Sequence, residues 1–167
     1  MAEQSARRSL RATPGAARLP VVSLYSTVFR TTLRVHQFLY ERTDGLVGHR
    51  VLGVSTLLLR TTGRRSGETR TNALNYVEDG GRYIVVASKG GAPAPPAWFL
   101  NLQADPEVEV QIARRRIPCS ATVIEHDDPD FARLWKLVND HNAGRYDEYQ
   151  RKTDRPIPLV ALTSSAR

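Results

Sequence analysis

The spacing of hydrophobic and polar positions divides the chain into one long helical segment followed by a series of strands. Apolar side chains in residues 21–42 recur about every 3.6 positions, which predicts an amphipathic helix. Residues 54–62 are instead predicted to form a strand, and its three consecutive leucines at 57–59 are typical of a strand covered on both faces. Strict alternation at 107–112 and again at 117–124 predicts two strands with one buried face each.

Turn signals connect further strands without space for crossover helices. The sequence DGG at 79–81 is a strong hairpin signal between strands predicted at 69–78 and 83–87. The arginine run 114–116 is expected to form a solvated turn between the two alternating strands. A last strand is predicted at 157–162. Short connections of this kind predict antiparallel strands rather than a parallel sheet.

Two shorter helices are predicted among the strands. One covers 95–104, because proline is tolerated in a first turn and the Asp-Pro pair that follows ends the helix. Another follows the N-cap Asp128, with Pro129 at its first position and apolar residues at helical spacing behind it. With six strands and three helices, we expect a small antiparallel β-barrel with flanking helices, an α+β fold that is mainly β.

Residues 1–20 differ in composition from the rest of the chain. They are small, polar and basic, with two prolines and a glycine as breakers, which predicts a disordered basic tail. Residues 21–167 are expected to form a single domain, because a chain of 167 residues suits one ordinary domain. The amphipathic helix at 21–42 would be the first element of that domain.

The net charge of the chain is +7, from 24 Lys and Arg against 17 Asp and Glu, so acidic partners are favoured. Nucleic acid is not expected as a partner, because the basic residues have no stacking platform of exposed aromatic side chains beside them. The single cysteine, Cys119, excludes an internal disulfide and fits a reducing, cytoplasmic compartment. Helix 21–42 leaves open a peripheral contact with the inner face of the cell membrane.

The stretch 57–101 holds the residues with the clearest chemistry. Glycines flank the basic turn 64–66, where backbone N–H groups and arginine forks could hold a phosphate or carboxylate. Lys89 adds a second cationic corner, and the aromatic pair at 98–99 adds a wall. A flat aromatic ligand with an anionic tail would satisfy all three features. The alternative is a solvated hairpin end beside ordinary core aromatic residues.

Motifs for other kinds of chemistry are missing from the sequence. It has no G-x-G-x-x-G and no Walker loop, which excludes the usual dinucleotide and triphosphate sites. The four histidines are scattered and no metal site is expected. An enzyme with this sequence would therefore take its chemistry from a bound organic cofactor, while the protein supplies position and charge.

Three segments carry a family resemblance. They are TTGRRSGETRTN at 61–72, EDGGRYIVVASKGGAPAPPAWFLNLQADPEVEVQI at 78–112 and YDEYQRKTDRPIPLVAL at 146–162. In order and spacing they resemble the deazaflavin (coenzyme F420)-dependent nitroreductase and quinone reductase family. This resemblance implies a six-stranded antiparallel split β-barrel of the flavin-reductase-like kind. It also implies coenzyme F420 as the cofactor, with flavin mononucleotide (FMN) as the runner-up.

The resemblance implies roles for individual residues. The arginine turn would hold the phosphate of the coenzyme and its glutamate tail, and a later loop would surround the cofactor near its ring. Tyr146 and Tyr149 would border the acceptor and position it, with packing as the alternative role for both. The cofactor-binding residues implied in this way are Arg64, Arg65, Ser66, Arg70, Asn72, Ala87, Ser88, Lys89, Gly90, Gly91, Trp98, Phe99 and Asn101.

Departures from the family pattern lie toward the acceptor side. The family commonly has Asn-Pro-Leu-Tyr where this chain has NALN at 72–75, and two aromatic positions of nitroreducing members are Ala143 and Lys152 here. The resemblance implies an oxidoreductase that passes a hydride from reduced coenzyme F420 to a quinone-like, nitro or other electrophilic small molecule. Quinone-type acceptors are expected before nitroimidazoles. The alternative is a non-catalytic deazaflavin or flavin carrier, and the sequence leaves the oligomeric state open.

Overall fold

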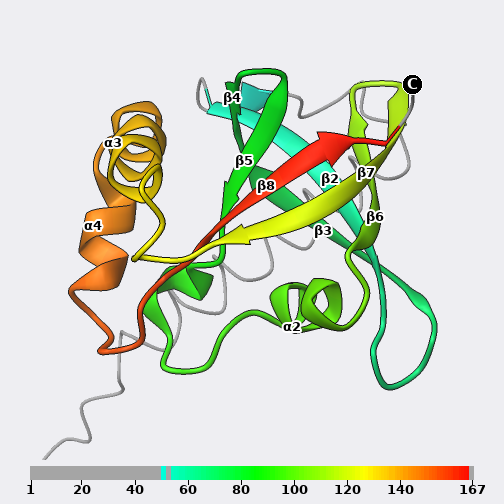
Figure 1. Ribbon diagram of the computed structural model, residues 1–167, viewed down its shortest axis with the longest axis horizontal. Helices are drawn as coiled ribbons and strands as arrows, with labels where there is room; N and C mark the ends of the chain where they lie inside the picture. The colour runs from blue at the N-terminus through cyan, green and yellow to red at the C-terminus, as the bar shows by residue number, and fades with distance from the viewer. Residues whose placement is uncertain (1–49, 52–53, 166–167) are drawn as a thin grey trace, which may run out of the picture. The chain divides into compact units, whose positions relative to one another are not determined.

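The computed structural model describes residues 50–51 and 54–165 of the chain. The predicted tail at 1–20 and the predicted helix at 21–42 lie outside the described residues. The described part is mainly β: an antiparallel sheet curls into a half-barrel and carries few helices (Figure 1). Within this part of the chain, no helix is both long enough and apolar enough to cross a membrane.

The strands pair antiparallel throughout. Their bounds are β1 Arg50–Val51, β2 Val54–Thr62, β3 Thr69–Asn75, β4 Val77–Asp79, β5 Arg82–Val86, β6 Glu107–Ile112, β7 Arg115–Ile124 and β8 Leu159–Ser164. The order across the sheet is β1-β2-β6-β7-β8-β5-β4, and β3 pairs with β2. Every strand predicted from the sequence is therefore present near its expected place, and the antiparallel arrangement is confirmed.

The strand count differs from the prediction at one point. The strand expected at 69–78 is interrupted at Tyr76, whose N–H donates to the carbonyl of Ser55 in β2 at 3.1 Å. Before this residue the chain pairs with β2 as β3, and after it the chain pairs with β5 as β4. The prediction of six strands was wrong, because the single strand expected at 69–78 is two strands that pair with different neighbours. The half-barrel has seven strands, β2 to β8, and β1 pairs with the start of β2.

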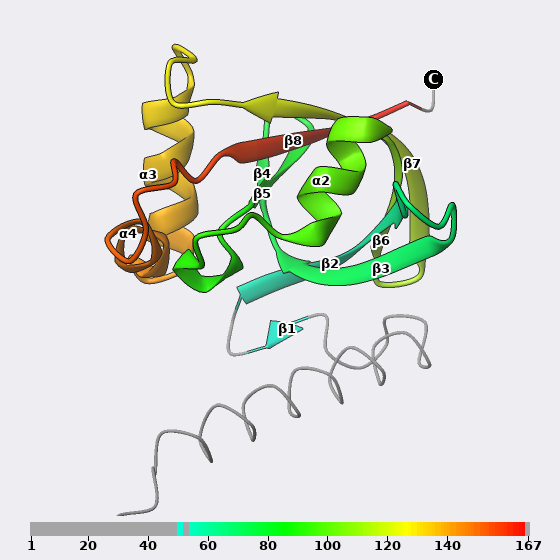
Figure 2. The same cartoon turned by 90° about the horizontal axis from the view of Figure 1, so that it is seen from below.

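Helices lie both inside and outside the curled sheet. Their bounds are η1 (a 3-10 turn) Lys89–Gly91, α2 Ala97–Ala104, α3 Phe131–His141 and α4 Arg145–Gln150. Figure 2 shows α2 in the hollow of the sheet, where Trp98, Phe99 and Leu102 join the core formed by the inner strand faces. α3 and α4 lie beside β4, β5 and β8 and form a second core, in which Leu134 and Tyr146 are buried.

Two element boundaries differ from the sequence prediction for local reasons. Asp128, the predicted N-cap, accepts the N–H of Asp130 at 2.8 Å within a turn, so α3 begins after Asp130. The hairpin before β7 is made by Ala113 and Arg114, and Ala113 takes a left-handed φ of 51° there. β7 therefore begins at Arg115, inside the run that was expected to form the turn.

An ion network fastens the hairpin between β4 and β5 to α3. Asp79 accepts from Arg82 at 2.8 Å and from Arg133 at 2.7 Å, and Asp130 also accepts from both arginines. The hydrogen bonds from Arg133 and then Arg82 hold the pKa of Asp79 well below its ordinary range. The hairpin predicted at 79–81 is confirmed, and its far end is tied to a helix on another part of the chain.

Candidate functional site

The loop between β2 and β3 closes on itself through backbone hydrogen bonds. The N–H of Gly63 donates to the carbonyl of Glu68 at 2.8 Å, and the N–H of Gly67 donates to the carbonyl of Gly63 at 2.7 Å. A Cβ on Gly63 would lie 2.8 Å from Ser66 Oγ, and Gly67 has a left-handed φ of 69°. Glycine is therefore favoured at both positions. The N–H groups of Gly63, Ser66 and Gly67 donate within the loop and are not turned outward toward a ligand, as the sequence had suggested.

A cavity of about 630 Å³ opens beside this loop, between the ends of β2 and β3 and helix α2. Its volume falls within the roughly 300–1,000 Å³ that is usual for small-molecule sites. Seven of the residues predicted to bind the cofactor line it, although they come from two separate segments of the sequence. These residues are Arg64, Arg65, Ser66, Arg70, Asn72, Trp98 and Asn101.

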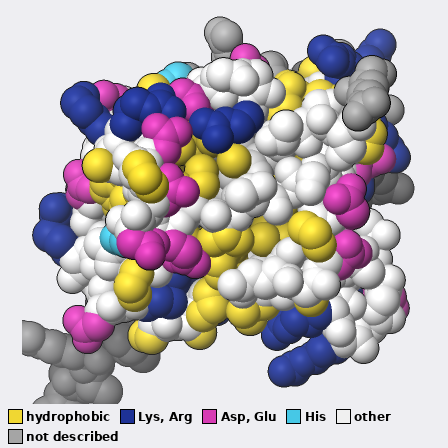
Figure 3. All heavy atoms as spheres, in the orientation of Figure 1, with side chains coloured by type: hydrophobic (Ala, Val, Ile, Leu, Met, Phe, Trp, Pro, Cys, Tyr) yellow, Lys and Arg dark blue, Asp and Glu magenta, His cyan; other side chains and the backbone are white. Residues whose placement is uncertain are grey.

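Basic side chains dominate the mouth of this cavity. Figure 3 shows Lys and Arg side chains at the lower right of the molecule, where Figure 1 places the loop between β2 and β3. Arg65 is exposed and has no hydrogen-bond or ion-pair partner among the described residues. Arg70 pairs with Glu68 at 2.6 Å, but both side chains are more than half exposed and such a pair is easily exchanged. The cavity can therefore receive an anionic group.

Asn101 joins helix α2 to the arginine loop. Its Oδ1 accepts from the backbone N–H of Arg64 at 3.3 Å and from the Arg64 guanidinium at 3.2 Å. Its Nδ2 donates to the hydroxyl of Thr61 at 3.2 Å, and the side chain is buried. Asn101 therefore lines the cavity while its amide already holds the loop in place.

The two predicted aromatic residues occupy different positions. Trp98 lines the cavity, whereas Phe99 lies in the core beneath it, and the two rings meet edge to face at 6.1 Å. Both side chains are only 5% exposed. Phe99 therefore supports the wall from inside the half-barrel, and Trp98 forms the wall itself.

The second predicted corner, Ala87 to Gly91, is a separate loop, and none of its residues lines the cavity among the described residues. Lys89, Gly90 and Gly91 take left-handed φ values of 48°, 67° and 80° in succession. The Lys89 ammonium donates to the carbonyl of Pro95 at 3.4 Å, just before α2. Backbone of this kind is uncommon outside glycine and persists only where surrounding contacts hold it.

Gly91 packs directly against the end of α4. A Cβ at this position would lie 2.5 Å from the carbonyl oxygen of Tyr149 and 2.9 Å from Cβ of Lys152. Figure 2 shows the segment between β5 and α2 beside α4. The structure therefore brings the predicted cofactor loop against the helix that carries the two predicted acceptor tyrosines.

Tyr146 and Tyr149 both lie on α4, but they differ in exposure. Tyr146 is 7% exposed, and its ring packs against a tilted Trp135 ring at 6.4 Å and edge to face against Tyr149 at 6.2 Å. Its hydroxyl has no hydrogen-bond partner among the described residues, and burial raises its pKa to about 12. Tyr149 is half-buried, and the ammonium of Lys152 lies 5.3 Å from its ring centre.

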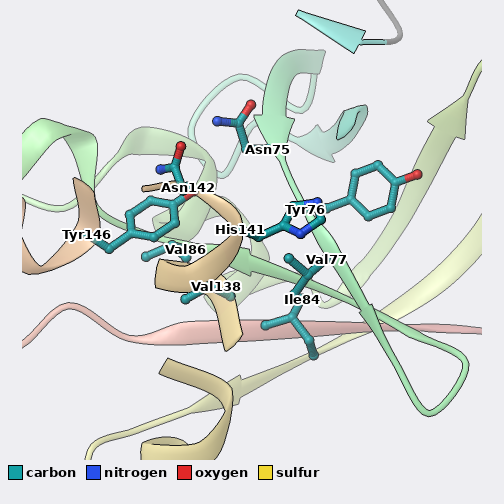
Figure 4. A pocket seen from close by; sticks show the side chains of 9 residues that line it. All are labelled: Asn75, Tyr76, Val77, Ile84, Val86, Val138, His141, Asn142 and Tyr146. Atoms are coloured by element: carbon teal, nitrogen blue, oxygen red, sulfur yellow. The ribbon is translucent and has the colours of Figure 1, made fainter. Parts of the chain in front are cut away.

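A narrow cavity of about 10 Å³ separates Tyr146 from the junction of β3 and β4 (Figure 4). Asn75 and Asn142 also line it, and a volume of this size holds about one water molecule. The two tyrosines are therefore outside the large arginine-lined cavity. The structure unites the predicted residues of the cofactor tail and leaves the predicted acceptor residues in a different place.

One residue that sequence reasoning missed connects the segment after α4 to the loop at 87–92. The guanidinium of Arg155 donates to the backbone carbonyls of Ala87, Ser88 and Ala92, which surround η1. Burial lowers the pKa of this guanidinium. Arg155 stands in the segment TDR near the end of the chain, and periodicity gives no signal that it contacts a loop more than 60 residues earlier.

The fold and the site define a class: a small antiparallel half-barrel with an arginine-lined cavity. The family model described as F420H(2)-dependent quinone reductase matches residues 32–164, and the chain belongs to this family. It is accordingly an F420-dependent oxidoreductase, with coenzyme F420 as its cofactor, which confirms the expectation from the sequence.

Similar proteins support this membership. The F420H(2)-dependent quinone reductase Rv1261c of Mycobacterium tuberculosis (strain ATCC 25618 / H37Rv) is 48% identical over 132 residues, 78% of this chain and 89% of that protein. A solved F420-H2 dependent reductase, FDR-A, has a TM-score of 0.57 at 40% identity and covers 64% of this chain and 92% of its own. A structure described as a domain-swapped dimer has a TM-score of 0.60 at 35% identity and covers 83% and 98%.

Proposed function

We propose that this protein uses reduced coenzyme F420 to reduce a quinone-type acceptor. The observation that carries the proposal is the cavity of about 630 Å³, in which arginines from the β2–β3 loop face Trp98 and Asn101 of α2. Membership of the F420H(2)-dependent quinone reductase family supports the same cofactor and favours a quinone over a nitro compound. When bound, the coenzyme supplies the hydride, and the protein supplies binding, orientation and charge.

The residues around the cavity fit a phosphate and carboxylate tail. Arg65 offers a guanidinium without a partner among the described residues, and Arg70 can exchange its exposed contact with Glu68 for a ligand oxygen. Arg64 is fixed by Asn101, so it would keep the loop in shape while its remaining N–H groups face the ligand. We assign Arg65 and Arg70 as the principal anion contacts and Arg64 as their anchor.

We place the acceptor near α4 and the loop at Ser88–Gly91. Tyr149 is half-buried beside Gly91 and presents an aromatic face with a hydroxyl, which suits stacking and hydrogen bonding to a quinone. The buried Tyr146 supports that ring from behind. Ala143 and Lys152 leave this edge less aromatic than in nitroreducing relatives, which supports a bulky quinone before a nitroimidazole.

Titration of the purified protein tests the cofactor assignment. Coenzyme F420 should bind more tightly than FMN or a nicotinamide dinucleotide, and equal or better binding of either rival would contradict the proposal. Reduced F420 should then be oxidised only when an acceptor is present, and faster with quinones than with nitroimidazoles. Tight binding of F420 without turnover across a panel of quinones would instead favour the non-catalytic carrier.

A further inference from the structure

Arg155 binds the loop around η1 through backbone oxygen atoms. Its Nη2 donates to the carbonyl of Ser88 at 3.1 Å, to that of Ala87 at 3.3 Å and to that of Ala92 at 3.4 Å. Its Nε also donates to Ala92 at 3.4 Å, and its Nη1 donates to the carbonyl of Pro156 at 3.4 Å. One side chain thus holds both ends of a loop that lies far from it in the sequence.

The guanidinium does this without a carboxylate. No acidic side chain among the described residues forms an ion pair with Arg155, although the side chain is half-buried. Taking a charged guanidinium partly out of water costs free energy, and here only hydrogen bonds to backbone carbonyls offset that cost. Its position is therefore set by the geometry of the loop and not by attraction to an acid.

The backbone that carries Arg155 is itself held firmly. The amide of Gln150 donates to the carbonyls of Thr153 at 3.1 Å and Arg155 at 3.0 Å, and it accepts the N–H of Ile157 at 2.9 Å. The hydroxyl of Thr153 accepts the N–H of Arg155 at 3.2 Å. These bonds make the segment after α4 a rigid support from which the guanidinium reaches the loop.

The loop needs such a support because its backbone is unfavourable by itself. Three consecutive residues, of which Lys89 is not a glycine, take left-handed φ values. Each such non-glycine residue costs about 1–3 kcal/mol and persists only where other contacts impose it. The carbonyls of Ala87, Ser88 and Ala92 lie on both sides of this strained stretch, so Arg155 fixes its entry and its exit together.

We propose that Arg155 is a positioning residue that holds the loop 87–92 in the shape required to bind coenzyme F420. The inference rests on the proposed function, because it takes this loop as the second contact region of the cofactor. Arg155 would not touch the cofactor. It would fix the ammonium of Lys89, which lies 3.4 Å from the carbonyl of Pro95, in the position where the ligand meets it.

Three variants test this role, with the fluorescence of F420 as the measure of binding. Arg155→Ala should weaken F420 binding roughly ten- to a hundredfold, because the charged hydrogen bonds that hold the loop in its binding shape are lost. Arg155→Lys keeps the charge but loses the fork, and it should still weaken binding several-fold. Arg151→Ala, an exposed arginine four residues earlier, is the matched control and should bind as wild type. Binding that is unchanged in both Arg155 variants would overturn the proposal.

A double variant separates positioning from direct contact. If Arg155 acts through Lys89, Arg155→Ala combined with Lys89→Ala should bind no more weakly than the weaker single variant. Full additivity of the two losses would overturn the proposal. Added ethylguanidinium should restore binding to Arg155→Ala but not to Lys89→Ala.

Hydrogen exchange of the loop amides gives a readout that does not depend on the cofactor. In unliganded Arg155→Lys, the amides of residues 88–92 should exchange faster than in wild type, while those of β6 and β7 should not change. Equal exchange in the loop would overturn the inference even if the Ala variant does not fold. Failure of wild type to bind F420 would instead refute the proposed function, and the exchange comparison would still decide whether Arg155 positions the loop.

Discussion

The two glycine-rich basic loops of this protein resemble each other in sequence but are built in different ways. The loop between β2 and β3 closes through its own backbone, from Gly63 to Glu68 and Gly67. The loop at 87–92 depends on Arg155 and on the end of α4 for its shape. The first loop is exposed and lined with charge, whereas the second is locked between other elements and exposes one lysine.

This difference predicts how each loop responds to change. A self-contained turn loses a ligand contact when a surface arginine is removed, but its shape survives. A loop imposed by distant contacts loses its shape when any of those contacts is disturbed, and the ligand site is lost with it. Substitutions in the first loop should therefore weaken ligand binding without changing the stability of the fold. Substitutions in the second loop should change both.

The largest effect is expected at Gly91. A methyl group there would lie 2.5 Å from the Tyr149 carbonyl on a backbone with φ of 80°, so Gly91→Ala must displace the loop or α4. We expect the free energy of unfolding to fall by roughly 2–4 kcal/mol, with loss of F420 binding. Urea unfolding and F420 titration of the same preparation would check both.

Gly90→Ala is the matched control for this variant. Gly90 also has a left-handed φ, but nothing lies within 4 Å of a Cβ there. The substitution should therefore cost only about 1 kcal/mol from the backbone conformation. Equal losses for the two variants would show that the contact with α4 does not shape the loop.

The sequence predicted the first loop better than the second for a physical reason. The glycines and arginines at 61–72 interact with near neighbours, so local pattern is enough to indicate a turn with an anion site. The contact between Arg155 and Ser88 joins residues 67 positions apart, and no local period reports it. Long-range contacts of this kind are fixed by the fold, and the sequence predicted the fold class but not the contacts between distant residues.

The strand count failed for a related reason. Residues 69–78 lie between two turn signals, which predicts one strand, and nothing in their composition shows that the pairing partner changes at Tyr76. That change follows from the curling of the sheet: the chain pairs with β2 before Tyr76 and with β5 after it. The burial of Tyr146 under α3 was equally hidden, because its family position indicated a ligand contact while its helical spacing allowed packing.

An intermediate effect is expected at Asn101, which connects the self-contained loop to α2. Asn101→Ala leaves the N–H of Arg64 and the buried hydroxyl of Thr61 without their partner. The free energy of unfolding should fall by about 1–3 kcal/mol, and F420 binding should weaken because Arg64 is released. Gln103→Ala, on an exposed position of the same helix, should change neither property. Unfolding curves that coincide for Asn101→Ala and wild type would contradict this role.

Substitution of Arg65 is expected to weaken ligand binding without changing the stability of the fold. Arg65→Ala removes an exposed guanidinium without a described partner, so the unfolding free energy should stay within about 0.5 kcal/mol of wild type. F420 binding should weaken roughly ten- to a hundredfold, and its dependence on salt should decrease. Arg114→Ala at the opposite hairpin is the charge-matched control. Binding that matches this control would identify the arginine loop as a solvated turn.

The smallest effect is expected at Tyr146, whose hydroxyl is buried without a described partner. Tyr146→Phe should leave F420 affinity unchanged and slow quinone reduction only modestly, because the ring still supports Tyr149.

The hydroxyl of Tyr146 should also affect how the stability of the protein depends on pH under alkaline conditions. Burial raises its pKa from 10.0 to about 12, so the unfolded chain loses this proton first and wild-type stability falls as pH rises through that interval. The Phe variant lacks the hydroxyl and should lose less stability as pH rises from 10 to about 12 in urea unfolding. Identical alkaline losses in both proteins would mean that the hydroxyl of Tyr146 is open to water, and that the narrow cavity beside it is not closed.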